Sequence, residues 1–224
     1  MTSIIIPTYN EADQIAATIK KLNGTNSDGH FEIIVSDGGS TDDTITLAKQ
    51  AGAITLLSQR KGRAAQMNAG AALAKGEILY FLHADTMPPV GFINDIANAI
   101  SNGYQAGCFM LSFDYPHWFL KANCWLTRFD VNAIRFGDQS LFVTKEEFDR
   151  TGGFSERHIV LEDQELIKRL RKAIRFKIIK RPVVTSARKY LENGIYKTQG
   201  IFFIIYFCTC LVFRRINSST LIRN

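Results

Sequence analysis

The sequence predicts an α/β fold, with a mostly parallel central sheet flanked by helices on both faces. Two observations lead to this prediction. Short runs of β-branched residues alternate with amphipathic segments through the first 86 residues, and glycines or polar residues follow most of these runs. The length of 224 residues fits one domain, which we expect over residues 1–190, with a helical tail over residues 191–224.

Four strands and three helices are expected in the first half of the chain. Pro7 ends the first strand, and Asn10 and Ser40 each precede an acidic residue in the pattern of a helix-capping box. We expect strands at residues 2–6, 32–36, 53–57 and 77–82, and helices at residues 10–22, 40–48 and 63–75. This alternation indicates a parallel sheet, since parallel neighbours need a long crossover between them.

The pattern is less regular after Pro88 and Pro89, although helices and strands are still expected. The helix at residues 161–172 is the clearest, because three aliphatic residues recur on one side of it. The other helices are expected at residues 92–100 and 118–128, and the strands at residues 105–113, 140–143, 176–179 and 183–186.

The tail contains an uncharged run, residues 201–213 (IFFIIYFCTCLVF), which is followed by Arg214 and Arg215. This apolar helix is shorter than the roughly 20 residues that a membrane-spanning helix needs. Three interpretations stay open: a helix in the core or in a homodimer interface, a helix lying in the membrane interface, and a short spanning segment.

The chain is basic, with a net charge of +6 and a pI near 9.2, which favours an anionic partner. The basic residues are spread out without a nucleic-acid-binding signature, so we expect no nucleic acid partner. The N-terminal residues look like a strand rather than a signal peptide. We expect a cytoplasmic protein that can reach the inner face of the membrane, with no disulfide or zinc site, because the cysteines form no CxxC pair: Cys108, Cys124, Cys208 and Cys210.

Polar and acidic residues follow three of the expected strands, where ligands bind in open α/β sheets. Residues 7–11 follow the first strand, residues 37–40 the second and residues 83–85 the fourth. Each segment alone is typical of an ordinary turn or helix cap. Together they would lie on one rim of one sheet, which predicts a binding site there.

Four ordered segments, IIIPTYNE, IIVSDGGSTDDT, KGRAAQMNAGAALAKGE and ILYFLHADT, resemble the nucleotide-binding half of family-2 glycosyltransferases, which have the GT-A fold, a Rossmann-like α/β architecture. The match is close over residues 1–86 and looser to about residue 190, through LEDQEL. The resemblance therefore implies a nucleotide-binding half over residues 1–86 and an acceptor half over residues 87–190.

The resemblance implies a nucleoside-diphosphate sugar as donor. By resemblance Glu11 would lie toward the ribose and Asp37 would bond the base. A carboxylate accepts hydrogen bonds from uracil and from guanine alike, so UDP and GDP both stay open. The residues implied to contact the nucleotide are Pro7, Tyr9, Glu11, Asp37, Arg63, Asn68, Ala84 and Asp85.

A divalent cation, Mn²⁺ or Mg²⁺, is implied on the diphosphate, with Asp85 as its main protein ligand. The chain departs from the family here, because His83 stands where the first aspartate of the metal motif is usual. If His83 binds the metal, its nitrogen favours Mn²⁺ over Mg²⁺. The alternative is that His83 only forms a hydrogen bond with a neighbour.

The acceptor half carries the implied catalytic acids, Glu162 and Asp163. Asp163 shares a helix face with apolar residues, although an acid in a first helical turn is also favoured by the helix dipole. By resemblance Asp163 would be the general base of an inverting transfer to an acceptor hydroxyl. Asp138 and Gln139 would lie under the acceptor and diphosphate, although Asp138 could instead be an ordinary acidic residue of a turn. Arg188 would clamp phosphate, or it could belong to a solvated basic patch.

Two other functions compete with this interpretation. A nucleotidyltransferase usually carries a glycine-rich basic signature after its first strand, and the segment PTYNEADQ lacks it. A non-catalytic scaffold that retains the nucleotide cleft is favoured by His83 and disfavoured by the intact Asp85 and Asp163. The acceptor is not identified, but the aromatic stretch at residues 115–129 and the apolar tail would suit a lipid-linked acceptor or peripheral membrane contact.

Overall fold

The computed structural model describes residues 1–25, 30–129, 139–157 and 160–205. Its contacts divide the chain into two compact units, Met1–Thr185 and Ser186–Asn224. The first unit holds the whole sheet and is described first.

The N-terminal half of the first unit follows the predicted alternation of strands and helices. Its elements are β1 (Thr2–Thr8), α1 (Ala12–Thr25), β2 (Phe31–Asp37), α2 (Thr44–Gln50), β3 (Ile54–Leu57), α3 (Arg63–Leu73) and β4 (Ile78–Phe81). The four strands pair in parallel in the order β3-β2-β1-β4. The capping box predicted at Ser40 is wrong, because α2 begins only at Thr44 and its cap residue Asp43 makes no side-chain cap hydrogen bond.

The rest of the first unit completes the sheet with strands of mixed direction. Its elements are β5 (Thr86–Met87), α4 (Phe92–Ser101), β6 (Ala106–Phe113), α5 (Trp118–Leu126), β7 (Leu141–Thr144), α6 (Lys145–Arg150), α7 (Glu162–Ala173) and β8 (Phe176–Thr185). The full order is β3-β2-β1-β4-β7-β6-β8-β5, with β7 antiparallel to both of its neighbours. The two strands predicted at residues 176–186 are one strand, in which the register shifts so that Ile179 faces Phe109 and Pro182 faces Met110.

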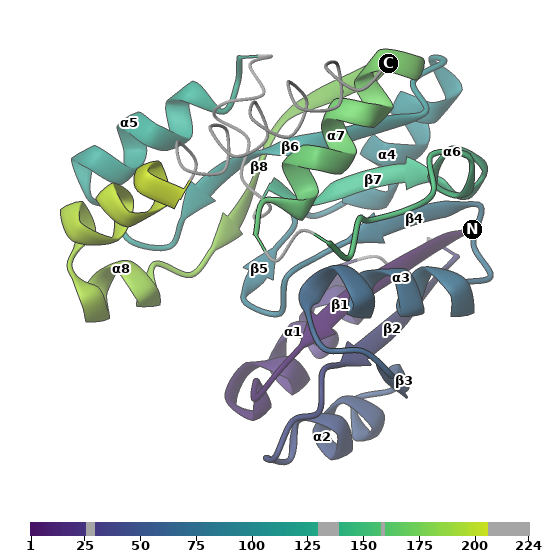
Figure 1. Cartoon of the computed structure of the whole chain (residues 1–224), viewed down its shortest axis with the longest axis horizontal. Coiled ribbons are helices and arrows are strands. Elements are labelled where there is room, and N and C mark those ends of the chain that lie inside the picture. The colour runs from purple at the N-terminus through teal and green to yellow at the C-terminus, as the bar shows by residue number, and fades with distance from the viewer. Residues whose placement is uncertain (26–29, 130–138, 158–159, 206–224) are drawn as a thin grey trace, which may run out of the picture. The chain divides into compact units, whose positions relative to one another are not determined.

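Helices cover both faces of the sheet (Figure 1). Buried residues of α1, α2 and α4 pack with one set of strand side chains, and those of α3, α6 and α7 pack with the other set. The contact of α3 with β1 is close, because a Cβ atom on Gly70 would lie 2.5 Å from Cγ2 of Ile5. A side chain larger than that of glycine would therefore push α3 away from β1 at this position.

The parallel pairing brings the carboxyl ends of the first strands to one edge of the sheet. Thr8, the last residue of β1, pairs with Asp37, the last residue of β2, and the end of β4 lies beside Ile5. The loops that follow these strands therefore share one rim, as predicted.

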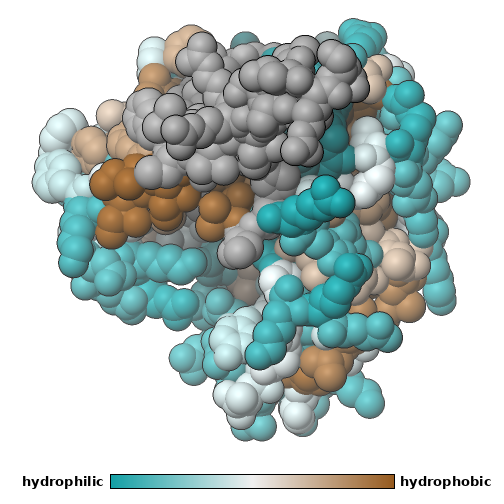
Figure 2. Space-filling model, viewed as in Figure 1, coloured by the Kyte–Doolittle hydropathy of each residue, from teal (hydrophilic) through white to brown (hydrophobic). Residues whose placement is uncertain are grey.

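The second unit contains α8 (Arg188–Asn193) and a helical segment over residues 195–205. Tyr190 donates a hydrogen bond from its hydroxyl to Gln199 Oε1, 3.0 Å away, which ties the two helices together. The predicted apolar run is described only to residue 205, and its residues 201–204 are exposed (Figure 2). Among the described residues, no helix combines the length and the apolar character that crossing a membrane requires.

Candidate functional site

The loop after β2 is built around the buried carboxylate of Asp37. The residue is fully buried, and its Oδ2 accepts hydrogen bonds from the backbone N–H groups of Gly39 and Ser40 at 2.8 and 2.7 Å. Its Oδ1 accepts from the hydroxyls of Ser40 and Thr8. This carboxylate therefore fixes the turn between β2 and α2, and the base contact implied for Asp37 stays a prediction.

The loops after β1 and β2 are joined by bonds between side chains and backbone. The N–H of Asn10 donates to Ser40 Oγ at 2.8 Å, and Asn10 Oδ1 accepts from the N–H of Thr41 at 2.9 Å. The N–H of Glu11 donates to Thr44 Oγ1 at 2.8 Å. Asn10 adopts a left-handed backbone conformation, with φ of 54°, in this arrangement. The two loops thus form one fixed wall before any ligand arrives.

A cavity of about 400 Å³ opens beside this wall, lined by Tyr9, Gly38, Gly39, Thr41, Lys61, Gly62 and Gln66. Tyr9 is 60% exposed, so its ring is free to stack on a planar ligand. Of the residues predicted to contact the nucleotide, this cavity contains Tyr9. Lys61 was missed because the loop after β3 was not considered as a strand end, although the same rule applies to it.

The floor of this cavity depends on Gln66, a buried residue of α3. Its Nε2 donates to the carbonyl oxygens of Thr8 and Ser36, at 2.6 and 3.1 Å, and so joins the ends of β1 and β2. A Cβ on Gly38 would lie 2.8 Å from that nitrogen, so a larger residue here would displace the Gln66 amide. The cavity is therefore formed by the carboxyl ends of the strands and is not merely a gap between loops.

Four of the predicted site residues come together next to this cavity. Arg63, at the start of α3, forms ion pairs with Glu162 and with Asp163, the latter at 3.2 Å between Nη2 and Oδ2. His83, just after β4, lies with Nε2 3.4 Å from Nη1 of Arg63. One guanidinium therefore connects the nucleotide half of the chain to the acid pair of the acceptor half.

The acid pair occupies the first turn of α7, where the helix dipole favours negative charge. Glu162 and Asp163 are 1% and 5% exposed, so each needs a partner to remain charged. Glu162 Oε2 is buried and has no hydrogen-bond partner in the part of the chain that the structure describes. The pair is thus buried and shares the guanidinium of Arg63, and Glu162 keeps one acceptor atom that no described residue satisfies.

The loop after β4 carries the predicted metal residues. Ala84 is buried, and its carbonyl oxygen accepts a hydrogen bond from Thr18 Oγ1 at 2.8 Å, which anchors the loop to α1. Asp85 is half-buried, and its Oδ1 lies 3.4 Å from the hydroxyl of Thr86. Within the described ranges, no group of three or more His, Cys, Asp or Glu side chains is arranged to hold a metal.

The remaining predicted residues differ in position. Asn68 ties α3 to the segment after α6: it donates from Nδ2 to the carbonyl of Phe154 and accepts from its N–H, both at 2.9 Å. Gln139 is buried, with Oε1 unpartnered among the described residues. Asp138 lies outside the described residues, and Arg188 belongs to the second unit. Pro7 and Glu11 lie half-buried in the wall after β1.

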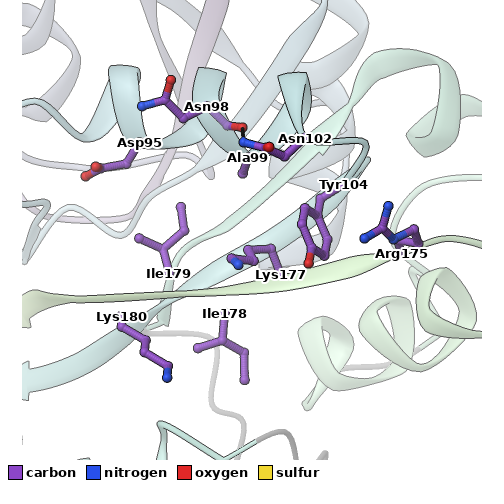
Figure 3. Close-up of a pocket in the computed structure, with 10 residues that line it drawn as sticks. All are labelled: Asp95, Asn98, Ala99, Asn102, Tyr104, Arg175, Lys177, Ile178, Ile179 and Lys180. Atoms are coloured by element: carbon purple, nitrogen blue, oxygen red, sulfur yellow. Dashed lines mark hydrogen bonds between the residues drawn. The ribbon is translucent and has the colours of Figure 1, made fainter.

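A second cavity, of about 600 Å³, lies between α4 and β8 and is separate from this site. Figure 3 shows Arg175 and Lys177 on either side of Tyr104, with their charged groups 4.5 and 4.8 Å from its ring centre. The cavity is near the beginnings of β6 and β8, at the edge opposite the rim. None of the predicted site residues lines it.

Comparison with known sequences identifies a matching family. A family model described as "Glycosyl transferase family 2" matches residues 3–155. The undecaprenyl-phosphate 4-deoxy-4-formamido-L-arabinose transferase of Aeromonas hydrophila is 28% identical over 130 residues, which cover 54% of this chain and 40% of that protein. Glycosyltransferase AglE of Haloferax volcanii is 30% identical over 123 residues, covering 51% and 40%. The aligned region thus spans about 40% of the length of these relatives.

Solved structures share the fold at low sequence identity. TarS (residues 1–349) of S. aureus in complex with UDP has a TM-score of 0.68 and 18% identity, covering 83% of this chain and 60% of that one. The mannosyltransferase PcManGT of Pyrobaculum calidifontis, in complex with GDP-Man and Mn²⁺, has a TM-score of 0.65 and 19% identity, covering 82% and 56%. The predicted GT-A fold is confirmed by this likeness.

Proposed function

Because this chain belongs to glycosyl transferase family 2, we propose that it transfers a sugar from a nucleoside-diphosphate sugar to an acceptor hydroxyl, with inversion at the anomeric carbon. The observation that carries this proposal is the convergence of Arg63, Glu162 and Asp163 beside the cavity at the strand ends. This convergence supports the proposal, because the diphosphate of a donor in the cavity would need a cation nearby and the acceptor hydroxyl would need a base.

The donor would bind with its base on Tyr9 and its phosphates toward Arg63. Lys61 and Gly62 line the cavity and directly precede Arg63, and Gln66 lines it from the next turn of α3. A nucleotide in the cavity would therefore have Lys61 and Arg63 near its phosphates, and both are suited to bind them. The related structures contain UDP and GDP-Man, so the fold accommodates either base.

Of the two residues that the resemblance implies as metal ligands, one suits a divalent cation better than the other. Asp85 is a half-buried carboxylate on the rim, and hard cations such as Mn²⁺ and Mg²⁺ favour oxygen ligands with phosphate completing the shell. His83 fits less well as placed, because its Nε2 faces the guanidinium of Arg63. We propose that Asp85 holds the cation, which when bound would neutralise the departing diphosphate.

Asp163 is the proposed general base. It would take the proton of the acceptor hydroxyl while that oxygen forms a bond to the anomeric carbon and the bond from this carbon to the diphosphate breaks. The electron pair of the broken bond leaves with the nucleoside diphosphate. Because the acceptor oxygen attacks from the face opposite the diphosphate, the configuration at the anomeric carbon is inverted. Arg63 would hold Asp163 and Glu162 in position and, with 40% of its side chain exposed, is able to turn toward the phosphate.

The acceptor is proposed to be linked to a lipid and to react through a hydroxyl group. The relative from Aeromonas hydrophila is named for undecaprenyl phosphate, which supports a lipid acceptor. A lipid phosphate would itself be the nucleophile and would need no base. Two buried carboxylates would repel that phosphate, whereas a hydroxyl group requires the base that Asp163 can supply.

The donor half of the proposal is tested by calorimetric titration with UDP and with GDP, each with and without Mn²⁺. Metal-dependent binding of one nucleotide is expected for the native chain, and we expect Asp85→Ala to abolish the metal dependence. Asp149→Ala, which removes an exposed acid of α6, is the matched control and should bind as the native chain does. If neither nucleotide binds to the folded protein, the chain is a scaffold rather than a transferase.

The role of Asp163 is tested with two acceptors, a lipid-linked sugar with a free hydroxyl and a prenyl phosphate. With the hydroxyl acceptor, Asp163→Asn should lower kcat by about 10²–10⁴-fold. Equal turnover of the prenyl phosphate by the native chain and by Asp163→Asn, together with no turnover of the hydroxyl acceptor, would reject the hydroxyl acceptor and the base.

A further inference from the structure

Helix α5 carries large aromatic and basic side chains on its solvent-facing side. Its opposite side is anchored to the protein by the buried residues Leu120 and Cys124, which are one turn apart. The exposed residues follow helical spacing into the turn that ends the helix, and we call them the aromatic–basic face: Trp118, Lys121, Ala122, Trp125, Arg128 and Phe129. The face is thus one continuous stripe of the helix.

Large aromatic side chains gather on this face. Trp118, Trp125 and Phe129 are 65%, 49% and 43% exposed, and large apolar side chains that gather at the surface mark a binding region. The guanidinium of Arg128 lies 4.8 Å from the ring centre of Trp125. The face contains two cations and no acid, so it complements an anionic partner.

The sheet register places this face at the same edge as the rim. Phe81, at the end of β4, pairs with Leu141, which pairs with Cys108 of β6. Because β7 is antiparallel to both, β6 runs in the direction of β4, and it continues from Cys108 to Phe113, about 16 Å further at ~3.3 Å per residue. Helix α5 follows that end, and so it lies beyond the rim on the side of the strand ends.

A groove between β6 and α5 opens at this position. Its cavity is about 500 Å³, and its lining includes the apolar side chains of Met110, Phe113 and Leu120 and the acid Asp114. Three residues of the aromatic–basic face, Lys121, Trp125 and Arg128, also line this largely apolar groove, in the arrangement that a charged headgroup on an acyl or prenyl chain would match.

We propose that the aromatic–basic face of α5 docks on the surface of an anionic lipid bilayer and presents the groove to a lipid-linked acceptor. The part of this proposal that concerns the lipid-linked acceptor rests on the proposed function, and the docking on a bilayer goes beyond it. Tryptophan favours the boundary between headgroups and acyl chains, and lysine and arginine bind anionic headgroups. Only one side of α5 is free, so the helix would lie in the interface plane.

The charges favour a bilayer over a second copy of this chain. A two-fold dimer through this face would bring Lys121 and Arg128 of one copy against the same residues of the other. Like charges would face each other at close range there, whereas an anionic bilayer supplies the opposite sign.

Co-sedimentation with phosphatidylcholine vesicles, with and without phosphatidylglycerol, tests the docking. We expect the native chain to bind the vesicles that contain phosphatidylglycerol. Trp118→Ala/Trp125→Ala and, separately, Lys121→Glu/Arg128→Glu should each weaken the binding by about tenfold or more. The matched controls, Leu73→Ala/Val90→Ala and Lys20→Glu/Lys49→Glu, change exposed residues elsewhere and should bind as the native chain does.

Equal vesicle binding by the native chain and by both α5 variants would overturn the proposal. A native chain that sediments as a dimer, and becomes monomeric in Trp118→Ala/Trp125→Ala, would overturn it in favour of a self-association surface. Calorimetric nucleotide binding by the same variants separates this failure from a failure of the proposed function. If docking alone is lost, the α5 variants still bind nucleotide like the native chain and still use a short, water-soluble acceptor.

Discussion

Removal of the Arg63 guanidinium should destabilise the protein through the acids that it leaves behind. The side chains of Glu162 and Asp163 are 2% and 7% exposed, whereas that of Arg63 is 40% exposed. Breaking a fully buried ion pair costs about 3–5 kcal/mol, and partial exposure of one partner lowers this. For Arg63→Ala we expect a loss of about 2 kcal/mol, which lowers Tm by about 4–8 °C in a protein of this size.

The reasoning is checked by a double-mutant cycle followed by thermal and urea unfolding. In the Glu162→Gln/Asp163→Asn background neither member of the acid pair carries a charge that Arg63 would have to compensate, so Arg63→Ala should cost less than about 0.5 kcal/mol. Arg60→Ala is the control, because its pair with Glu156 is formed by an arginine side chain that is 74% exposed and should contribute little. An equal loss in both backgrounds would refute the view that uncompensated buried charge is the cause.

Three further predictions concern the scaffold of the site. Gly70→Ala places a methyl group 2.5 Å from a buried side chain of β1, so it should lower the free energy of unfolding by about 1–3 kcal/mol in urea titration. Asn68→Ala removes two hydrogen bonds to Phe154 and should lower the free energy of unfolding by about 2 kcal/mol in urea titration. The Thr44 hydroxyl donates a hydrogen bond to the Asp42 carboxylate and lowers the pKa of Asp42. This hydrogen bond therefore stabilises the fold at pH values above the ordinary pKa of aspartate, and the stabilisation is lost as pH falls through the lowered pKa of folded Asp42. Thr44→Val should move the NMR titration midpoint of Asp42 upward.

The first half of the fold was predictable because its signals are local. Each strand from β1 to β4 is a short apolar run, and each helix between them has its own periodicity. The order of the later strands was not predictable, because β7, β6 and β8 pair out of chain sequence. Residues 180–182 separate the two strands that the sequence predicted at 176–179 and 183–186. In the structure this segment is the point where the register of β8 shifts.

The parts of the site that lie at the ends of strands were predictable, whereas side-chain contacts between residues far apart in the sequence were not. The rim residues follow from the carboxyl ends of parallel strands. The helix-start position of Glu162 and Asp163 was also visible in the sequence, but their common partner, Arg63, lies about a hundred residues earlier. Gln66 was missed because an isolated glutamine on an alanine-rich helix gives no local signal of the two strand ends that it joins.

The bridge from Arg63 to the acid pair also has a consequence for the order in which the molecule folds. It closes a loop of 100 residues between Arg63 and Asp163, so its entropic cost is met only after the intervening strands have paired. A nascent chain that has released only β1 to β4 from the ribosome carries the residues that line the cavity, but it has no acid pair. Under the proposed function, competence for transfer would therefore arise in a late step of folding, once α7 has packed on the sheet.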